Sequence, residues 1–337
     1  MKTIRRIFAV LTGVVFYIAG LLKLMDPVGS SLIVGEYLQF LHLAFLGGLA
    51  KTLAVILSLL ETIVGAALVT GVMRKATALV CSAMVLFFTI LTFFLWRLDP
   101  PMDCGCFGEA FHLTHLQTLY KNLLLCIFCL VAFLPPHKLG SPRRSKIAAF
   151  GITALSTLAF CIYSLIALPL KDYTPLACGT ELSKEGEEGL EDLPALSFFS
   201  PEGEYCDSLA VSGKVMIVSV YNTERVRDWD RLKSFLSEAG NAGFTPLLLV
   251  AGDSPADRYF FADGRTLMTL NRSNGGATFV SDGRIVEKWA YRFLPSAQKL
   301  AETEAADPVT TITASLSSGK LRFQGFLLYV FAVMLLL

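Results

Sequence analysis

Charged residues are scarce in this sequence. Asp, Glu, Lys and Arg make up 17% of the 337 residues, whereas a soluble domain usually contains about 25%. Hydrophobic residues reach 54%, more than a single soluble core needs to bury. The formal net charge is only +1, so the sequence gives no electrostatic reason to expect a nucleic-acid partner. The composition therefore indicates an integral membrane protein and points to no particular chemistry.

Five hydrophobic runs are long enough to cross a membrane, for which a helix needs about 20 mostly apolar residues. The first run, 7–24, lacks a small-residue cleavage site, so we expect a retained helix rather than a signal peptide. A sixth run, 323–337, is short and is expected to span as well. Residues 29–48 are less uniformly apolar and favour an amphipathic helix at the membrane interface. The remaining runs are 49–73, 76–96, 116–134 and 147–168.

Basic residues predict the orientation, because cytoplasmic loops carry an excess of Lys and Arg. Three basic clusters occupy alternate loops, while loops 26–48 and 99–115 contain few such residues. A cytoplasmic N-terminus places all three clusters in the cytoplasm and the soluble region after the fifth run outside it, which for a bacterial inner membrane is the periplasm. The clusters are Lys2, Arg5 and Arg6; Arg74 and Lys75; and Lys138, Arg143, Arg144 and Lys146.

The soluble region alternates strand and helix patterns after a linker, 171–193, that contains an acidic, Gly-rich stretch. Strands, helices and a hairpin follow in the order of a thioredoxin-like domain over 194–305. Active members carry Cys-x-x-Cys after the first central strand, where the thiol pKa is lowered. Here residues 221–226 contain no cysteine, and 275–278 lack the family's cis-proline. We therefore predict a redox-inert module that binds a peptide or partner, or packs against the helices. The predicted elements are strands 215–221 and 244–251, helix 228–239, a short element at 266–270, hairpin strands 277–280 and 284–289, and helix 295–304.

The eight cysteines divide by side under this topology. Four lie in predicted spans, and the pair Cys126 and Cys129 has Cys-x-x-Cys spacing on an apolar helix. Buried cysteine usually behaves as a small hydrophobe, so we interpret these residues as packing groups. The four are Cys81, Cys126, Cys129 and Cys161.

Cys104-Gly-Cys106 is the sharpest motif, and it lies on the predicted outer side, where disulfides persist. Gly105 tolerates the backbone angles of a small strained ring, and strained, exposed disulfides exchange readily. Its position would let a thiol couple meet secreted substrates and a membrane quinone. The predicted extracytoplasmic segments contain no Cys-x-x-Cys motif. We therefore do not expect this chain alone to pass electrons through a complete series of thiol pairs.

Three other interpretations of the two thiols remain open. They could form structural disulfides with Cys178 and Cys206, since four cysteines allow three connectivities. The latter two could instead form a structural disulfide with each other. Together with His112 and His115, the motif could bind zinc, for which two sulfur and two nitrogen ligands are suitable. The thiols could also stay unpaired and only close the loop.

Two ionisable residues lie within predicted spans. Glu61 is near the middle of the second span, where a carboxylate is costly unless it has a partner or is protonated. Lys23, near the outer end of the first span, is a candidate partner, although its long side chain could also reach the interface. Function and structural pairing both remain open for Glu61. Transport around Glu61 finds no support in a broken helix or an internal repeat.

These residues carry a family resemblance. The segment 20–27, with Lys23 and Asp26-Pro27, followed by Glu61, Gly65, Gly71 and Arg74, resembles the DoxX-like family. The loop 103–108 resembles the MauE-related branch of that family, and the resemblance covers residues 1–135. The rest looks like a longer, poorly characterised DoxX subgroup.

The resemblance implies a four-helix bundle in the inner membrane. MauE-like proteins are associated with maturation of a disulfide-rich periplasmic enzyme, and other DoxX relatives with thiol or quinone redox complexes. Only Cys104 and Cys106 carry over as candidate redox residues, and methylamine itself does not. The histidines of the loop are not part of the family pattern.

The leading hypothesis is a membrane accessory protein for extracytoplasmic thiol–disulfide redox or protein maturation, with a quinone or another thiol protein as electron partner. The alternative is a non-catalytic scaffold whose thioredoxin-like domain binds a secreted partner. The predicted organisation is a DoxX/MauE-like bundle at 1–135, a cytoplasmic loop and fifth helix at 136–170, the linker at 171–193, the thioredoxin-like domain at 194–305, and a tail with a sixth span at 306–337.

Overall fold

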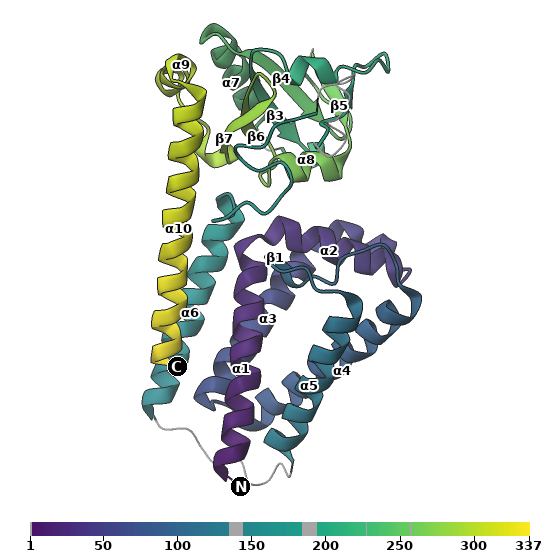
Figure 1. The fold of residues 1–337 in the computed structure, drawn as a ribbon, viewed down its shortest axis with the longest axis vertical. Helices are drawn as coiled ribbons and strands as arrows, with labels where there is room; N and C mark the ends of the chain where they lie inside the picture. Colours follow the sequence, from purple (N-terminus) through teal and green to yellow (C-terminus); the bar gives the residue numbers. More distant parts are fainter. Residues whose placement is uncertain (1, 135–143, 184–193, 227, 257) are drawn as a thin grey trace. The chain divides into compact units, whose positions relative to one another are not determined.

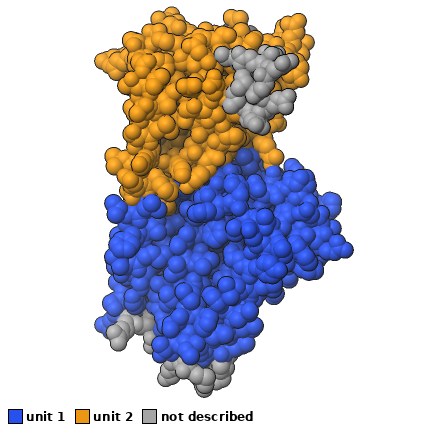
Figure 2. Space-filling model, in the orientation of Figure 1, with its two compact units in different colours: residues 1–165, 327–337 blue, residues 166–326 orange. Residues whose placement is uncertain are grey.

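The computed structural model describes residues 2–134, 144–183, 194–226, 228–256 and 258–337. The chain divides into two compact units, residues 1–165 with 327–337 and residues 166–326, coloured separately in Figure 2. The acidic stretch of the predicted linker lies outside the described residues, as do Lys138 and Arg143 of the third basic cluster.

Six helical segments of the described chain are long and apolar enough to cross a membrane (Figure 1). The prediction of a multi-pass helical membrane region is therefore confirmed. Many large apolar side chains on these helices are exposed, as expected for surfaces that face lipid. The helices are α1 (Lys2–Met25), α3 (Ala50–Thr70, with the 3-10 helix η1, Ala44–Leu49, before it), α4 (Arg74–Leu98), α5 (His115–Phe133), α6 (Arg144–Ile166) and α10 (Pro308–Leu336).

The last helix is longer than the short run that the sequence predicts. Helix α10 begins at Pro308 rather than near residue 323. Its first half is rich in Ser and Thr, which lowers the mean hydropathy and hides the helix from a search for apolar runs. Ile312 of this half packs into the core of the second unit, so tertiary contacts stabilise a segment with a weak sequence pattern.

Helices α1 and α3 approach each other closely at glycines. A Cβ atom on Gly65 would lie 2.6 Å from the Gly13 carbonyl oxygen and 2.8 Å from the Tyr17 Cα. A Cβ on Gly20 would lie 2.6 Å from the Ser58 carbonyl oxygen. Small residues that let helix backbones meet are a common basis for helix association in membranes.

A one-residue break separates α1 from α2 (Pro27–Phe40). Pro27 lacks a backbone N–H and occupies the first turn of α2, while the Asp26 carboxylate accepts a hydrogen bond of 2.9 Å from the Gly29 N–H. Helix α2 packs against α3 and is not among the candidate spans. It covers part of the region predicted as an interfacial helix but ends at Phe40, before η1.

The C-terminal end of α3 is capped by basic residues. Gly71 adopts a left-handed conformation with φ of 77°, and Arg74 donates to its carbonyl at 3.1 Å. Arg6 of α1 donates to the Leu68 carbonyl at 2.8 Å and also to the Val69 carbonyl. These guanidinium groups satisfy carbonyls that the helix itself leaves without partners.

The second unit contains a six-stranded mixed sheet with the order β2-β5-β4-β3-β6-β7. Strand β3 pairs in parallel with β4 and antiparallel with β6; β4 and β5 are parallel, and β7 and β2 are antiparallel to their neighbours. The short strands β2 and β5 were not predicted. The elements are β2 (Phe198–Phe199), η3 (Asp207–Ala210), β3 (Lys214–Val220), η4 (Thr223–Arg225), α7 (Trp229–Asn241), β4 (Thr245–Val250), β5 (Phe260–Ala262), α8 (Gly264–Leu270), β6 (Gly276–Ser281), β7 (Arg284–Trp289), η5 (Tyr291–Phe293) and α9 (Ala297–Ala305).

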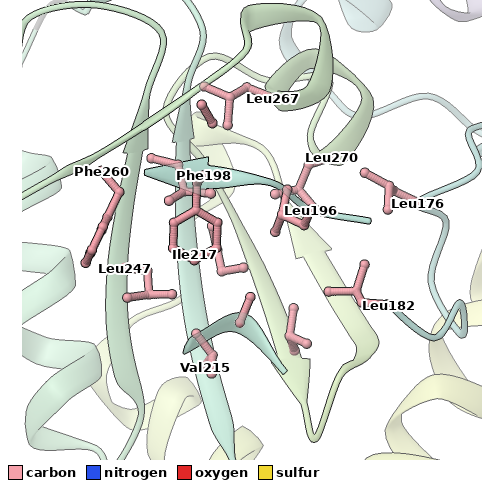
Figure 3. Close-up of a cluster of buried hydrophobic side chains, with 14 of the residues drawn as sticks. Leu176, Leu182, Leu196, Phe198, Val215, Ile217, Leu247, Phe260, Leu267 and Leu270 are labelled. Atoms are coloured by element: carbon pink, nitrogen blue, oxygen red, sulfur yellow. The ribbon is translucent and has the colours of Figure 1, made fainter. Parts of the chain in front are cut away.

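Both faces of this sheet are covered. Ile217 and Leu247 belong to the core on the face covered by α8 (Figure 3), whereas Met216 and Val218 belong to the core beneath α7 and α9. Successive side chains of a strand point to opposite faces. Strand β3 is therefore a continuous apolar run because both of its faces are buried.

Candidate functional site

The Cys-Gly-Cys motif lies on the loop that joins α4 to α5, at the start of the short strand β1 (Cys106–Glu109). Gly105 has φ of 54°, and a Cβ atom there would lie 2.8 Å from Cδ1 of Ile33. The position therefore requires glycine for both conformation and space. The Tyr37 hydroxyl donates a hydrogen bond to the Cys104 carbonyl, which fixes the loop to α2.

The two thiols of the motif have different environments. Cys104 is 2% exposed and packs with Leu91 and Leu95, whereas Cys106 is half-buried. A hydrogen bond from the Cys104 thiol holds the pKa of Cys106 well below its usual range; burial opposes this shift, and Lys121 and Lys23 support it. The same hydrogen bond and burial raise the pKa of Cys104. The two environments therefore favour Cys106 over Cys104 as the thiol that ionises first.

The histidines of the loop contact aspartates rather than the thiols. His115 Nδ1 lies 3.1 Å from Asp99 Oδ1, and its Nε2 lies 3.0 Å from the Met102 carbonyl oxygen. His112 Nδ1 lies 3.3 Å from Asp103 Oδ2. Within the described ranges, no cluster of three or more His, Cys, Asp or Glu residues could hold a metal ion, so the geometry gives the zinc interpretation no support.

The two ionisable residues that the sequence singled out in the spans form an ion pair. The Lys23 ammonium lies 2.7 Å from both carboxylate oxygens of Glu61, and the two side chains are 11% and 5% exposed. Lys23 also lies 5.8 Å from the centre of the Phe88 ring. The pair joins α1 to α3, and Gly108 of β1 packs close to the backbone of Lys23.

A cavity of about 210 Å³ brings these groups together. Its lining is mostly apolar and comes from α1, α2, α3, α4, α5 and the loop, all within the first unit. Apolar cavities with a few convergent polar groups are typical binding sites for small ligands. The polar and reactive groups that line it include Lys23, Glu61, Cys104, Cys106, Lys121 and Tyr37.

Sequence reasoning missed Lys121 and Tyr37 of this site. Lys121 lies inside a predicted span, and an ionisable residue there is a functional candidate by default, so the signal was available. Tyr37 had no comparable signal, because an aromatic residue on an interfacial segment is ordinary. Its role depends on the packing of α2 beside the loop.

The cysteines in the spans make only contacts within the membrane region. Cys81 and Cys129 have their sulfur atoms 3.9 Å apart, and the Cys126 sulfur lies 3.3 Å from the Thr89 hydroxyl. All three belong to or pack against one apolar cluster between the helices. The predicted role as packing groups is compatible with these contacts.

Cys178 and Cys206 both pack against the core cluster of the second unit that Figure 3 shows. All eight cysteines, these two included, are free thiols in the structure. Burial raises the pKa of Cys178 to about 11. The Cys206 thiol donates to the Glu204 carbonyl at 3.4 Å. A structural disulfide between the two stays a prediction.

The loop after β3 carries no reactive group of the kind found in redox enzymes. Asn222 and Asn274 are joined by two hydrogen bonds: the Asn222 N–H donates to the Asn274 side chain at 2.9 Å, and the Asn274 amide donates to the Asn222 carbonyl at 2.8 Å. Gly275 lies directly before β6 and donates to the Ser219 carbonyl at 2.7 Å. These bonds tie the loop after β3 to the loop before β6.

The fold and the site define a multi-pass helical membrane protein with a second unit built on a mixed sheet, and with a dithiol loop beside an apolar cavity. Residues 1–135 match the family described as methylamine utilisation protein MauE, and this range includes α1 to α5. This part of the chain is therefore a MauE-like membrane region. Neither the curated proteins nor the solved structures contain a match to this chain.

Proposed function

We propose that this chain is a membrane accessory protein for thiol–disulfide chemistry or protein maturation outside the cytoplasm, with Cys104 and Cys106 as the redox couple. The observation that carries the proposal is the placement of both thiols, with a buried Lys–Glu pair, in one cavity of the bundle. The basic clusters support a cytoplasmic N-terminus and therefore a loop on the oxidising side.

The chemistry is exchange through a mixed disulfide. An oxidised Cys104–Cys106 pair accepts a substrate thiolate, and a second substrate thiolate releases the reduced pair, so the substrate loses two electrons and two protons. The pair then returns these to its electron partner. The apolar cavity favours a quinone, which becomes a quinol, over a second thiol protein, because a quinone is small and lipid-soluble. In the reverse direction, a Cys thiolate attacks a substrate disulfide.

Trapping experiments test this proposal. Of the single variants Cys104→Ala and Cys106→Ala, the one that keeps the attacking thiol should accumulate mixed disulfides in native membranes, because its resolving thiol is missing. The control Cys178→Ser/Cys206→Ser should leave the adducts of the first unit unchanged. If neither single variant forms a cysteine-dependent adduct, the redox proposal is wrong.

The second unit supports a separate, non-catalytic function. We infer a thioredoxin-like fold from the order β4-β3-β6-β7, the helix between β3 and β4, and the helix after β7. The Asn222–Asn274 bonds occupy the loops that would carry the chemistry in an active member. A scaffold that binds a secreted partner is therefore the second candidate. If Cys104→Ser/Cys106→Ser retains function while deletion of 194–305, which leaves α10 intact, abolishes it, the scaffold hypothesis is correct.

A further inference from the structure

One cation in the cavity has no carboxylate partner. Lys23 is paired with Glu61 through both carboxylate oxygens, whereas Lys121 forms no ion pair with any carboxylate in the part of the chain that the structure describes. Lys121 belongs to α5, a candidate span, and its side chain is half-buried and lines the cavity. A cation held away from water is costly unless an anion lies near it.

The Lys121 ammonium lies near the start of β1. It lies 5.1 Å from the centre of the ring of Phe107, the residue that follows Cys106. Cys106 lines the same cavity and can become an anion there, and Lys121 and Lys23 both favour that anion. The carboxylate of Glu61 already accepts two hydrogen bonds from Lys23.

The two thiols also differ in access. Cys104 is 2% exposed, and the Tyr37 hydroxyl holds its carbonyl, so its thiol is the harder of the two for a partner to reach. Cys106 is half-buried and faces the cavity. Both thiols line the cavity, and Cys106, which is the more exposed of the two, is easier for a partner sulfur atom to reach.

Every element around the cavity except α4, which lines it with apolar residues and Thr92, contributes a titratable or charged group near Cys106. These are Cys104 and Asp103 on the loop, Lys23 on α1, Tyr37 on α2, Glu61 on α3 and Lys121 on α5. The carboxylate of Glu61 opposes a thiolate, but Lys23 neutralises it. Burial keeps the Tyr37 hydroxyl protonated, because it raises the pKa of that group. Lys121 is thus the cation near Cys106 that is not already bound to a carboxylate among the described residues.

We propose that Cys106 is the reacting thiol of the pair, that Lys121 is its counter-ion, and that Cys104 resolves the mixed disulfide. This division of roles rests on the proposed redox function. The Cys106 thiolate attacks a partner disulfide, forming one S–S bond and releasing one partner thiolate, which takes a proton. Cys104 then loses its proton and attacks the Cys106 sulfur, forming the Cys104–Cys106 bond and releasing the partner. The pair loses two electrons and the partner gains two.

Site-resolved alkylation tests the proposal in the reduced full-length protein in detergent, with iodoacetamide as probe and mass spectrometry as readout. Rates at Cys104 and Cys106 are followed between about pH 5 and pH 9, a range that includes the usual cysteine pKa. Cys106 should react at lower pH than Cys104. An opposite charge nearby commonly lowers a pKa by about 1–3 units, so Lys121→Gln should slow Cys106 alkylation by about tenfold or more below that pKa.

Two variants separate charge from structure. Lys121→Arg should restore the wild-type pH profile, because it keeps the cation. Lys75→Gln, which removes an exposed lysine at the start of α4, should leave the profile unchanged. A Cys106 profile that is the same in Lys121→Gln and wild type would overturn the assignment of Lys121, and preferential alkylation of Cys104 would overturn the assignment of Cys106.

Trapping distinguishes this inference from the proposed function on which it rests. Cys104→Ala should accumulate mixed disulfides, because its remaining thiol attacks and nothing resolves the product, while Cys106→Ala should not. The opposite pattern contradicts the division of roles and leaves the redox function standing. A shifted profile in Lys121→Gln without adducts in either cysteine variant supports the counter-ion and rejects the redox function.

Discussion

The Lys23 ammonium lies 2.7 Å from both carboxylate oxygens of Glu61, and this ion pair joins two adjacent membrane helices. Neither charge has much access to solvent, with 11% and 5% of the side chains exposed. A buried pair is often no more stable than an apolar replacement, but a single remaining charge is strongly unfavourable. Removing one partner should therefore cost the fold more stability than replacing both with apolar residues.

A double-mutant cycle tests this dependence. Lys23→Met and Glu61→Leu should each lower the free energy of unfolding in detergent by about 3–5 kcal/mol, because each leaves one buried charge without a partner. The double variant should lose clearly less than the sum of the two. Additive losses in denaturant titrations would show that the side chains do not interact.

The glycine contact between α1 and α3 predicts a second effect. Gly65→Ala should destabilise the bundle by about 1–3 kcal/mol, because the new methyl group meets the Gly13 carbonyl oxygen at 2.6 Å. Gly35→Ala on α2 is the matched control: nothing lies within 4 Å of its Cβ, so it should be neutral or stabilising by up to about 1 kcal/mol. Thermal unfolding in detergent measures both, and equal effects would contradict the close approach.

The loop geometry predicts a change in reactivity on substitution of Gly105. In Gly105→Ala, the added Cβ meets Ile33 and the φ of 54° becomes unfavourable, so the loop should lift from α2. Cys104, now 2% exposed, should then be alkylated at least several-fold faster at fixed pH. Adding Ile33→Ala should reverse part of the effect, since it removes the clash and leaves the backbone strain. Unchanged Cys104 reactivity in the single variant would show that the loop does not need glycine there.

The second unit should lose stability in acid through one ion pair. Asp172 lies 2.7 Å from the Lys288 ammonium; burial opposes its charge, but Lys288 and hydrogen bonds from Thr174 lower its pKa overall. A carboxyl whose folded pKa is depressed stabilises the fold above its unfolded pKa, and this contribution disappears as the pH falls through the folded value. Asp172→Asn should therefore be less stable than wild type near neutral pH, with the difference vanishing in acid.

Tryptophan fluorescence can follow this transition in the full-length protein. Replacing Trp96 with Phe leaves Trp229 and Trp289, both in the second unit. Urea titrations at a series of pH values then compare this background with and without Asp172→Asn. If the difference in free energy of unfolding between the two proteins stays constant with pH, ionisation of Asp172 does not contribute to stability.

The candidate site was only partly visible in the sequence. The Cys104-Gly-Cys106 motif, Glu61 and Lys23 stand out because thiols and charges are rare beside apolar runs. Their meeting at one cavity, with Lys121 and Tyr37, depends on helix packing that no local pattern encodes. The short strands β2 and β5 were missed for a related reason, since two or three residues carry too little periodicity to predict a strand.

The Cys104-Gly-Cys106 motif and the membrane helices are what the sequence determined by itself. Lipid removes water from the backbone, so any long apolar run must form a helix, and this requirement is readable residue by residue. Only the tertiary structure decided that α10 begins at Pro308, that Lys23 pairs with Glu61, and that Cys104 is more deeply buried than Cys106 beside one cavity. These features depend on which helix faces meet. They are determined by contacts between residues far apart in the chain, which cannot be predicted from composition or from the spacing of residues.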